Sequence, residues 1–288
     1  MRMRHRILGT AAGLAAAAIL AGCAPSVAAP PDLTELEPPA AAAEVDTIGI
    51  LGDSISPGVN ACDSQGQCAA ASWSGGSEPA VGSVAARLAA ASGIEPAVVN
   101  AAKDGGDVED ALGLVDEVIA AQPQLVTVLL GGNDACAPTL DEMTPAADFE
   151  ERLTQLFARI TGEVPDAAIL AMSVPDLHRL WELGRADART VQVWNSSPSC
   201  TNLLGSADEE SAEATARRDA VAARVVEYNA AIARVCGATE GCIHDDGAVY
   251  GYAFTADEIS AIDRFHPSIA GQRAIAAIAW DALERGTP

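Results

Sequence analysis

The chain has 288 residues, of which 49% are hydrophobic and 20% charged, enough for one α/β domain with a full core and too few for two complete domains. Its formal charge is −23, from 17 basic and 40 acidic residues, and Lys103 is the only lysine. The chain therefore lacks the basic surface that nucleic-acid binding requires, and we expect no nucleic acid or other polyanion as a partner.

The N-terminus carries the features of an export signal. Three arginines precede an apolar run from Ile7 to Ala21, which is too short and too rich in alanine for a membrane-spanning helix. The run ends in Leu-Ala-Gly-Cys at residues 20–23, which resembles a bacterial lipobox. The resemblance implies that residues 1–22 are removed and that Cys23 carries lipid, which would hold the protein on the outer face of the membrane. The alternative is ordinary cleavage and secretion.

Residues 23–44 are rich in proline and alanine and show no hydrophobic periodicity. This composition is typical of a semi-extended tether. We therefore expect a single folded domain over residues 45–288, standing off the membrane on this tether.

Apart from Cys23 the chain has six cysteines, and an even number in an exported protein indicates disulfides. Two pairs have identical five-residue spacers, Cys62/Cys68 and Cys236/Cys242, which favours pairing in chain order. Cys136 would then join Cys200. The rival interpretation is a zinc site, but the tight spacing and the histidine clusters of structural zinc are missing, so we expect no metal.

Short apolar runs alternate with longer amphipathic segments through the domain, which is typical of a parallel sheet covered by helices on both faces. Strands are predicted at Thr47–Leu51, Ala97–Asn100, Leu125–Leu130 and Ala167–Ser173, with a weaker fifth strand within Cys242–Tyr250. Helices are predicted at Val81–Ser92, Val108–Ala121, Ala147–Gly162, Ala212–Val235 and Ser268–Glu284. The expected architecture is a flavodoxin-like three-layer α/β/α sandwich.

Polar clusters follow the first three predicted strands where each strand ends. They are Gly52-Asp53-Ser54-Ile55, the run from Asn100 to Gly105, and Gly131-Gly132-Asn133-Asp134. A fourth cluster, Asp263-Arg264-Phe265-His266-Pro267-Ser268, lies at the start of the last helix. Ligands of such sheets bind beyond the carboxyl ends of the strands, so we expect these clusters to converge at one edge.

Taken together, the four clusters resemble the four sequence blocks of the SGNH/GDSL hydrolases, and the resemblance extends from about Val45 to Glu284. It implies the SGNH hydrolase fold without a cofactor. It also implies a serine nucleophile, a histidine that takes its proton, an aspartate that orients the imidazole, and an oxyanion hole. Carried over to this chain, the resemblance implies a triad of Ser54, His266 and Asp263, and an oxyanion hole of the Ser54 amide, the Gly105 amide and the Asn133 side chain.

The same assignment has a basis in the residues, because a serine hydroxyl is a weak nucleophile unless an adjacent base removes its proton. His266 has an aspartate three residues earlier, Asp263, which can reach its ring across one turn. His178 and His244 lack that arrangement. We expect His178 at the start of a helix, or alternatively on the cleft wall, and His244 in a tight turn with residues 245–247.

The pattern indicates the roles of the remaining polar residues of the clusters less specifically. Asn133 is suited to donate a hydrogen bond to an oxyanion, whereas either Gly105 or Gly106 could supply the backbone amide. Asp53 is expected to hold the serine turn, and Asp134 is expected to stabilise its own loop.

Carboxylic-ester hydrolysis through an acyl-serine intermediate is the leading hypothesis, with lipids, acylated sugars or small esters as substrates and a monomeric protein. Acyl transfer to an alcohol would use the same residues. A ligand-binding surface lipoprotein without activity is the alternative from another class, and the intact triad argues against it. In the long interval before Asp263, Trp181 and Trp194 are candidates for an acyl pocket, with simple packing as the alternative.

Overall fold

The computed structural model describes residues 29–42, 44–62 and 64–286. Five strands form one sheet in the order β2-β1-β3-β4-β5, and every neighbouring pair is parallel. This is the flavodoxin-like order, in agreement with the predicted fold class. The strands are β1 Thr47–Gly52, β2 Ala97–Asn100, β3 Leu125–Leu129, β4 Ala168–Ala171 and β5 Cys242–His244, so the weakly predicted fifth strand is present but short.

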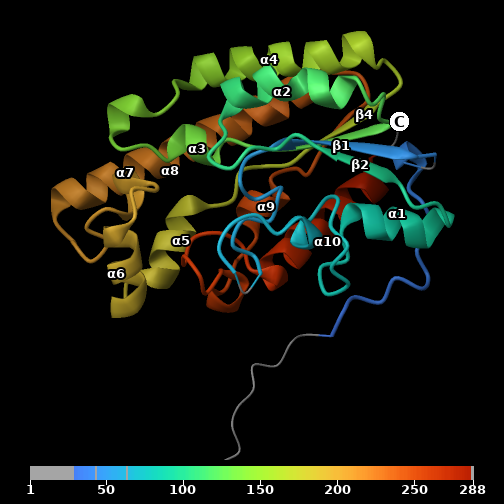
Figure 1. Ribbon diagram of the computed structural model, residues 1–288. Helices are drawn as coiled ribbons and strands as arrows, with labels where there is room; N and C mark the ends of the chain where they lie inside the picture. The colour runs from blue at the N-terminus through green and yellow to red at the C-terminus, as the bar shows by residue number, and fades with distance from the viewer. Residues whose placement is uncertain (1–28, 43, 63, 287–288) are drawn as a thin grey trace, which may run out of the picture.

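Long helices cover both faces of the sheet and make three layers (Figure 1). One face carries α2 (Val108–Ile119), α4 (Ala146–Glu163) and α8 (Ala212–Gly237), and the other carries α1 (Val84–Ser92) and α10 (Ile269–Arg285). Each face has its own apolar core. Because β1 and β3 lie in the middle of the sheet between these cores, all of β3 and nearly all of β1 is buried.

Polar caps decide where these helices begin. The Ser83 side chain accepts a hydrogen bond from the backbone N–H of Ala86, so α1 begins at Val84 and not at the predicted Val81. Asp107 caps α2 and forms a reciprocal capping box with Asp110. The helix that follows the fourth polar cluster, α10, begins directly after its cap, Ser268.

Short helices form a small lobe between β4 and α8, and of these the sequence predicted only the start of the first, at His178. They are α5 (Leu177–Gly184), α6 (Ala188–Ser196) and α7 (Thr201–Leu204). The lobe is tied to α8 by Arg218, which is buried, donates hydrogen bonds to carbonyls of the segment 203–209 and stacks on the Trp181 ring at 4.5 Å. The remaining short helices are α3 (Gly132–Ala135) and α9 (Ala248–Gly251), with 3₁₀ turns at Ala40–Ala42, Ala69–Ala71, Leu140–Glu142 and Ala256–Glu258.

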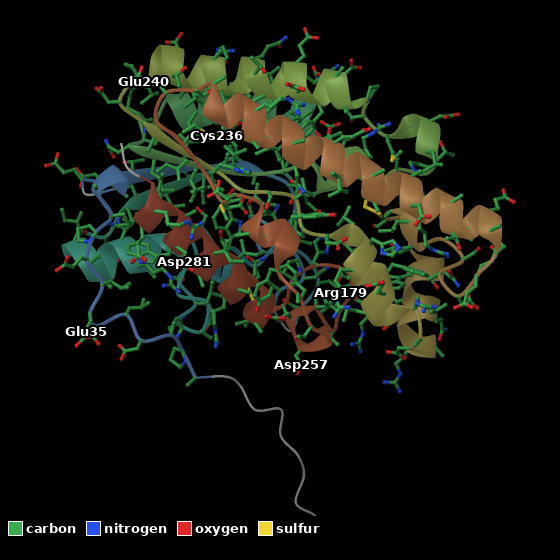
Figure 2. The ribbon with its side chains drawn as sticks, turned by 180° about the vertical axis from the view of Figure 1, so that it is seen from behind. Glu35, Arg179, Cys236, Glu240, Asp257 and Asp281 are labelled. Atoms are coloured by element: carbon green, nitrogen blue, oxygen red, sulfur yellow. A yellow bond between two sulfur atoms is a disulfide. The ribbon has the colours of Figure 1, made fainter. Side chains whose placement is uncertain are left out.

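Three disulfides join the cysteines in chain order, as predicted from their spacing: Cys62–Cys68, Cys136–Cys200 and Cys236–Cys242. The second is the long-range one and ties the segment after α3 to the start of α7. The third joins the end of α8 to β5, and Figure 2 shows Cys236 at that end of the helix. Acidic side chains such as Glu240, Asp257 and Asp281 lie on the outside of the domain.

The expected signal sequence, the lipobox and Cys23 lie outside the described residues. The described part of the expected tether lies against the domain: Leu36 packs on the apolar core beneath α1 and α10, and Ala42 is buried there. Contact with the domain therefore begins before the expected boundary at Val45. Of the helices in the described ranges, none has the length and apolar character needed to cross a bilayer.

Candidate active site

Ser54 lies in a tight turn directly after β1. The Asp53 N–H donates to the Leu129 carbonyl of the neighbouring strand, and the Asp53 side chain accepts the N–H of Ile55 at 2.9 Å. Gly52 is required at the strand end, because a Cβ there would lie 2.5 Å from the Leu129 carbonyl oxygen. Asp53 therefore holds the serine turn, in agreement with the role predicted for it.

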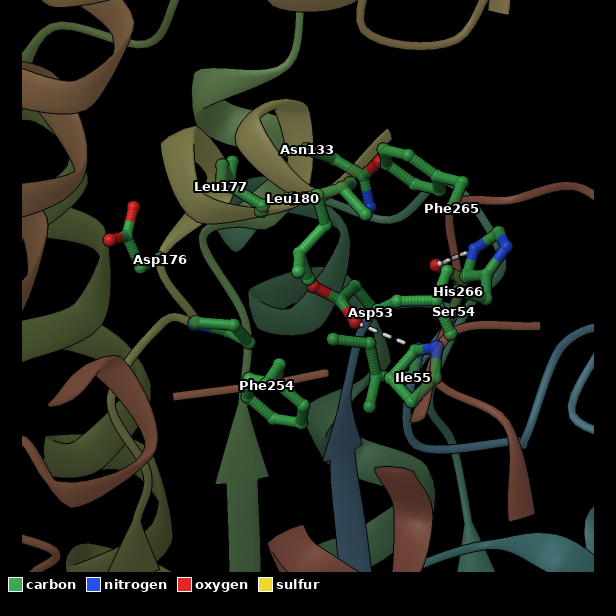
Figure 3. Close-up of a pocket in the computed structure, with 15 residues that line it drawn as sticks. Asp53, Ser54, Ile55, Asn133, Asp176, Leu177, Leu180, Phe254, Phe265 and His266 are labelled. Carbon is green, nitrogen blue, oxygen red and sulfur yellow. Dashed lines mark hydrogen bonds between the residues drawn. The ribbon is translucent and has the colours of Figure 1, made fainter. Parts of the chain in front are cut away.

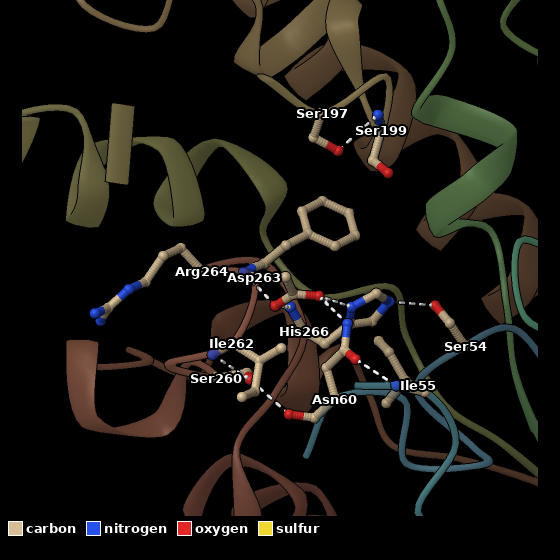
Figure 4. Close-up of polar contacts among 12 residues, drawn as sticks. Ser54, Ile55, Asn60, Ser197, Ser199, Ser260, Ile262, Asp263, Arg264 and His266 are labelled. Atoms are coloured by element: carbon tan, nitrogen blue, oxygen red, sulfur yellow. Dashed lines mark hydrogen bonds and ion pairs between the residues drawn. The ribbon is translucent and has the colours of Figure 1, made fainter. Parts of the chain in front are cut away.

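His266 and Asp263 meet Ser54 from the other end of the chain. The Ser54 Oγ lies 2.8 Å from His266 Nε2, and His266 Nδ1 forms a hydrogen bond with Asp263 Oδ2 (Figure 4). The other carboxylate oxygen of Asp263 accepts the backbone N–H groups of Phe265 and His266 at 3.0 and 3.1 Å. The three residues predicted as a triad thus form one continuous hydrogen-bonded chain.

A tight turn from Ser260 to His266 fixes this arrangement. The Ser260 N–H donates to the His266 carbonyl at 2.7 Å, and the Arg264 N–H donates to the Ser260 carbonyl. Arg264 has a left-handed backbone with φ of 60°, a conformation that costs free energy for a residue with a Cβ. The indole N–H of Trp194 donates to the Arg264 carbonyl at 2.9 Å and so supports the strained residue.

The ionised form of Asp263 is favoured by its partners. Burial by itself raises the pKa of this carboxyl, but the hydrogen bonds from His266 and Asn60 and the positive charge of the imidazole outweigh burial and hold the pKa below 3.8. An ionised carboxylate at Nδ1 keeps the proton on that ring nitrogen and leaves Nε2 free to accept a proton from Ser54.

Asn133 lies in α3 after β3 and lines the same pocket as Ser54 (Figure 3). One hydrogen of its side-chain amide is donated to the Gly106 carbonyl at 2.9 Å, which orients the group. The Gly106 N–H is engaged with the Lys103 carbonyl, whereas no described residue accepts the N–H of Ser54 or Gly105. Of the two candidate glycines, Gly105 therefore has the available amide.

Two further carboxyl groups are buried beneath the site. Burial raises the pKa of Asp53 to about 6 and that of Asp134 to about 7, against the ordinary 3.8. Asp134 accepts the N–H of Val108 at the start of α2, so it joins the third polar cluster to α2 instead of stabilising only its own loop.

An apolar pocket opens beside Ser54 (Figure 3), with a cavity volume of about 60 Å³. Its polar lining residues are Asp53, Ser54, Asn133, Asp176 and His266. Its apolar wall comes from three separate segments, the serine turn, α5 with the residue before its cap, and the segment on both sides of His266. It consists of Ile55, Pro175, Leu177, Leu180, Leu183, Phe254, Ile259, Phe265 and Pro267.

A second pocket lies on the other side of His266, with a volume of about 250 Å³. His266, Asp263 and Phe265 contribute to its wall, and Ser54 does not. Its other polar residues are Asn60, Asp104, Ser197 and Ser199. His266 therefore separates an apolar pocket from a polar one.

The two tryptophans considered for an acyl pocket do not line the apolar pocket. Trp194 is buried and lines the polar pocket, and the Trp181 indole donates to the Ala207 carbonyl at 2.8 Å inside the helical lobe. The packing alternative therefore describes them better.

The other two histidines line neither of these pockets. His178 is near the start of α5, where its ring contacts Trp181 and faces Glu182. His244 ends β5 and precedes a turn in which residues 246 and 247 both have positive φ, as expected. Among the described residues, no group of three or more His, Cys, Asp or Glu side chains is placed to hold a metal ion.

Sequence reasoning missed Asn60, whose side-chain amide donates to Asp263 at 2.7 Å, and the apolar residues of α5. The hydrophobic spacing of Leu177, Leu180 and Leu183 was the available signal for α5. For Asn60 no local signal exists, because its partner lies 203 residues away in the chain.

A sequence model of the GDSL-like lipase/acylhydrolase family matches residues 50–274. The match covers most of the chain and includes all four polar clusters. The chain therefore belongs to this family, which supports an ester hydrolase activity in general. No curated protein matches the chain in sequence.

Solved structures show the same fold over most of the chain. A lipase/acylhydrolase from Enterococcus faecalis is 22% identical with a TM-score of 0.51, covering 84% of this chain and 98% of its own. An alpha/beta hydrolase from the metagenome of Lake Arreo is 20% identical with a TM-score of 0.54, covering 84% and 97%. Axe2, an acetylxylan esterase from Geobacillus stearothermophilus, is 18% identical with a TM-score of 0.52, covering 84% and 95%. At these identities the likeness shows the fold alone.

The raised pKa values of Asp134 and Asp53 predict how stability depends on pH. The folded protein holds these protons up to about pH 6 to 7, whereas the unfolded chain releases them near 3.8. The folded state therefore binds more protons in this window, and the contribution of these groups to the free energy of unfolding falls as pH rises. We expect Asp134→Asn, which keeps the acceptor for Val108, to make that decline smaller. Urea denaturation of both proteins at several pH values from about 5 to 8 measures this, and equal declines would contradict it.

Proposed function

We propose that this protein is a serine carboxylic-ester hydrolase in which Ser54 is the nucleophile, His266 the base and Asp263 the residue that orients His266. The observation that supports this most directly is the unbroken hydrogen-bonded chain from Ser54 through His266 to Asp263. The same three residue types, in these roles, activate serine on several unrelated folds.

In the first half of the reaction, Ser54 Oγ attacks the ester carbonyl carbon while its proton moves to His266 Nε2. The carbonyl oxygen becomes an oxyanion, for which the N–H groups of Ser54 and Gly105 and the side-chain amide of Asn133 are the available donors. Collapse of this intermediate breaks the bond to the alcohol oxygen, which leaves with the proton from His266. The product is an acyl ester of Ser54.

Water completes the cycle by the same steps. His266 takes a proton from the water as its oxygen attacks the acyl carbon, and the second tetrahedral intermediate releases the carboxylic acid. His266 then returns the proton to Ser54 Oγ. The proton transfers to and from Ser54 use the hydrogen bond to His266 that the fold already holds.

The two pockets divide the substrate between them. The acyl carbon becomes bonded to Ser54 Oγ, and of these two pockets only the apolar one is lined by Ser54, so we assign the alcohol part to the polar pocket, which His266 also lines. The acyl part then occupies the apolar pocket beside Ser54 and Asn133. Because one water-sized group needs about 10–15 Å³ by the same measure, a cavity of about 60 Å³ fits a short acyl chain.

We also propose export and lipid attachment at Cys23. The lipobox-like residues 20–23 support lipid attachment, and the three disulfides support an oxidising compartment outside the cytoplasm.

Ser54→Ala tests the mechanism. Because this change removes the nucleophile, we expect kcat for short p-nitrophenyl esters to fall by about 10³-fold or more. A purified protein starting after Cys23, folded under oxidising conditions, is suitable for the assay. Ser196→Ala, an exposed serine on α6, is the control and should keep the wild-type rate. Equal hydrolysis by the Ser54→Ala protein would contradict the assignment.

Leu180→Ala tests the acyl pocket. Shortening this wall residue enlarges the cavity, so we expect kcat/KM for octanoate relative to butyrate to rise by about 10-fold, the scale of a few methylene contacts. Leu203→Ala, in the same helical lobe and the same core but outside the pocket, is the matched control for lost packing. An unchanged ratio in Leu180→Ala, or an equal rise in the control, would remove the support for this pocket.

Cys23→Ser tests lipid attachment in the full chain expressed in a bacterium. We expect the wild-type protein to enter the detergent phase on Triton X-114 partitioning and the variant to stay in the aqueous phase, because a lipid chain adds about 0.8 kcal/mol per buried methylene. Ser64, an exposed residue replaced by Ala, provides the control. Identical partitioning of wild type and Cys23→Ser would instead favour cleavage and release.

A further inference from the structure

The Asp263 carboxylate is held at both oxygens. One oxygen accepts the backbone N–H groups of Phe265 and His266, and the other accepts His266 Nδ1 and the side-chain amide of Asn60. All of these partners except Asn60 belong to the same turn as Asp263. The hydrogen bond from Asn60, at 2.7 Å, is therefore the contact that ties the carboxylate to a segment outside this turn.

Asn60 is itself fixed by the loop that the Cys62–Cys68 disulfide closes. Its backbone N–H donates to the Gly66 carbonyl at 2.8 Å, and its side-chain oxygen accepts the Gly66 N–H, also at 2.8 Å. With the amide oxygen committed to Gly66, the amide nitrogen must face Asp263. Figure 4 shows Asn60 pointing at the carboxylate from beside the triad.

The backbone of Asn60 adds two further constraints. Its φ of 55° is left-handed, which asparagine adopts more readily than most residues. Its carbonyl accepts the Ser260 hydroxyl at 2.5 Å, and Ser260 begins the turn that carries Asp263 and His266. Asn60 thus joins the disulfide loop to the histidine turn through both its side chain and its backbone.

We propose that Asn60 is a positioning residue for the Asp263–His266 pair, and that the Cys62–Cys68 disulfide acts on the reaction by holding the Asn60 amide against the Asp263 carboxylate. This inference rests on the proposed function of Ser54, His266 and Asp263.

The proposal has a pH consequence whose sign follows from the charges. Burial raises the pKa of Asp263, whereas the hydrogen bonds from His266 and Asn60 lower it. Without the Asn60 donor the carboxylate is less satisfied, so the Asp263–His266 pair binds its proton more tightly. The inactive protonated pair then persists to higher pH, and the acid limb of kcat/KM moves to higher pH.

Other charged groups lie near the pair. Asp53 directly follows β1 and interacts electrostatically with His266, and Asp104 lines the polar pocket. Arg264 belongs to the histidine turn, but its side chain points away from the imidazole (Figure 4), and Asp187 interacts with Arg264. All of them are retained in the variants below, so a difference between the variants and the wild type reports on Asn60.

Two substitutions of Asn60 test the proposal by full pH profiles of kcat/KM. Asn60→Gly keeps the left-handed backbone and removes the amide. We expect it to lower kcat/KM at pH 7 about 10-fold, the loss of one hydrogen bond to a charged group, and to move the acid limb up by about half a pH unit. Asn60→Asp keeps the acceptor for Gly66 but sets a second carboxylate against Asp263, so the same limb should move further, by about one unit or more.

The disulfide is tested with Cys62→Ser/Cys68→Ser. We expect this double variant to move the acid limb in the same direction as Asn60→Gly, and the two changes combined to move it no further, because they act through one contact. Cys236→Ser/Cys242→Ser opens a loop of the same length at the far end of β5 and is the matched control. Its acid limb should stay in place even where its stability falls, since the assay is read on folded protein checked by circular dichroism.

The outcomes separate the inference from the proposed function. A wild-type protein that hydrolyses esters only with Ser54 intact, together with the ordered shifts above, supports the inference. Rates that fall equally at every pH with an unmoved limb would show a purely structural role for Asn60 and overturn it, as would a limb that moves only in the control. Loss of Ser54 dependence in the wild type would instead overturn the proposed function.

Discussion

The contact between Ser54 and His266 joins the N-terminal and C-terminal parts of the domain at the site. The two residues are 212 positions apart, and their side chains meet at 2.8 Å only if the first strand and the last helix are both in place. Burial of β1 between two cores fixes the serine end, and the cap Ser268 with the turn from Ser260 fixes the histidine end. Because both ends are held by many contacts, the site can tolerate the strained backbone of Arg264.

Buried polar groups connect these two ends to the rest of the sheet edge. Asp53 shapes the serine turn, Asp134 ties the segment with Asn133 to α2, and Asn133 itself is aligned by the Gly106 carbonyl. Preorganised donors of this kind stabilise developing charge without having to reorganise during the reaction, and that is the main requirement for acyl chemistry. Burial of these carboxyl groups disfavours their charged forms, which is why the pKa values of Asp53 and Asp134 are raised.

The segments that would give the proposed enzyme its selectivity are those furthest from the sheet. The helical lobe of α5, α6 and α7 supplies the apolar wall through Leu177 and Leu180 and part of the polar pocket through Ser197 and Ser199. The Cys136–Cys200 disulfide and Arg218 hold this lobe to the core. The sheet edge holds the proposed catalytic residues, and the lobe lines the pockets. Because the lobe can differ while the sheet edge stays the same, one fold can accept different esters.

The sequence by itself determined the elements of the sheet and the composition of the polar clusters. Hydrophobic periodicity is a local property, so β2 was predicted with its observed bounds and α8 to within two residues at its end. The two identical spacers favoured the disulfide pairing that the structure has, and the motifs predicted Ser54, Asn133 and His266 at one edge. The helices α6 and α7 were not predicted, and α5 was predicted only as a helix start at His178, because all three are short and their hydrophobic pattern is weak. Tertiary structure decided the rest: which glycine keeps a free amide, which apolar side chains meet beside Ser54, and that Asn60 reaches Asp263. Each of these depends on residues that are distant in the chain and are brought together only by folding, for which a local pattern carries no information.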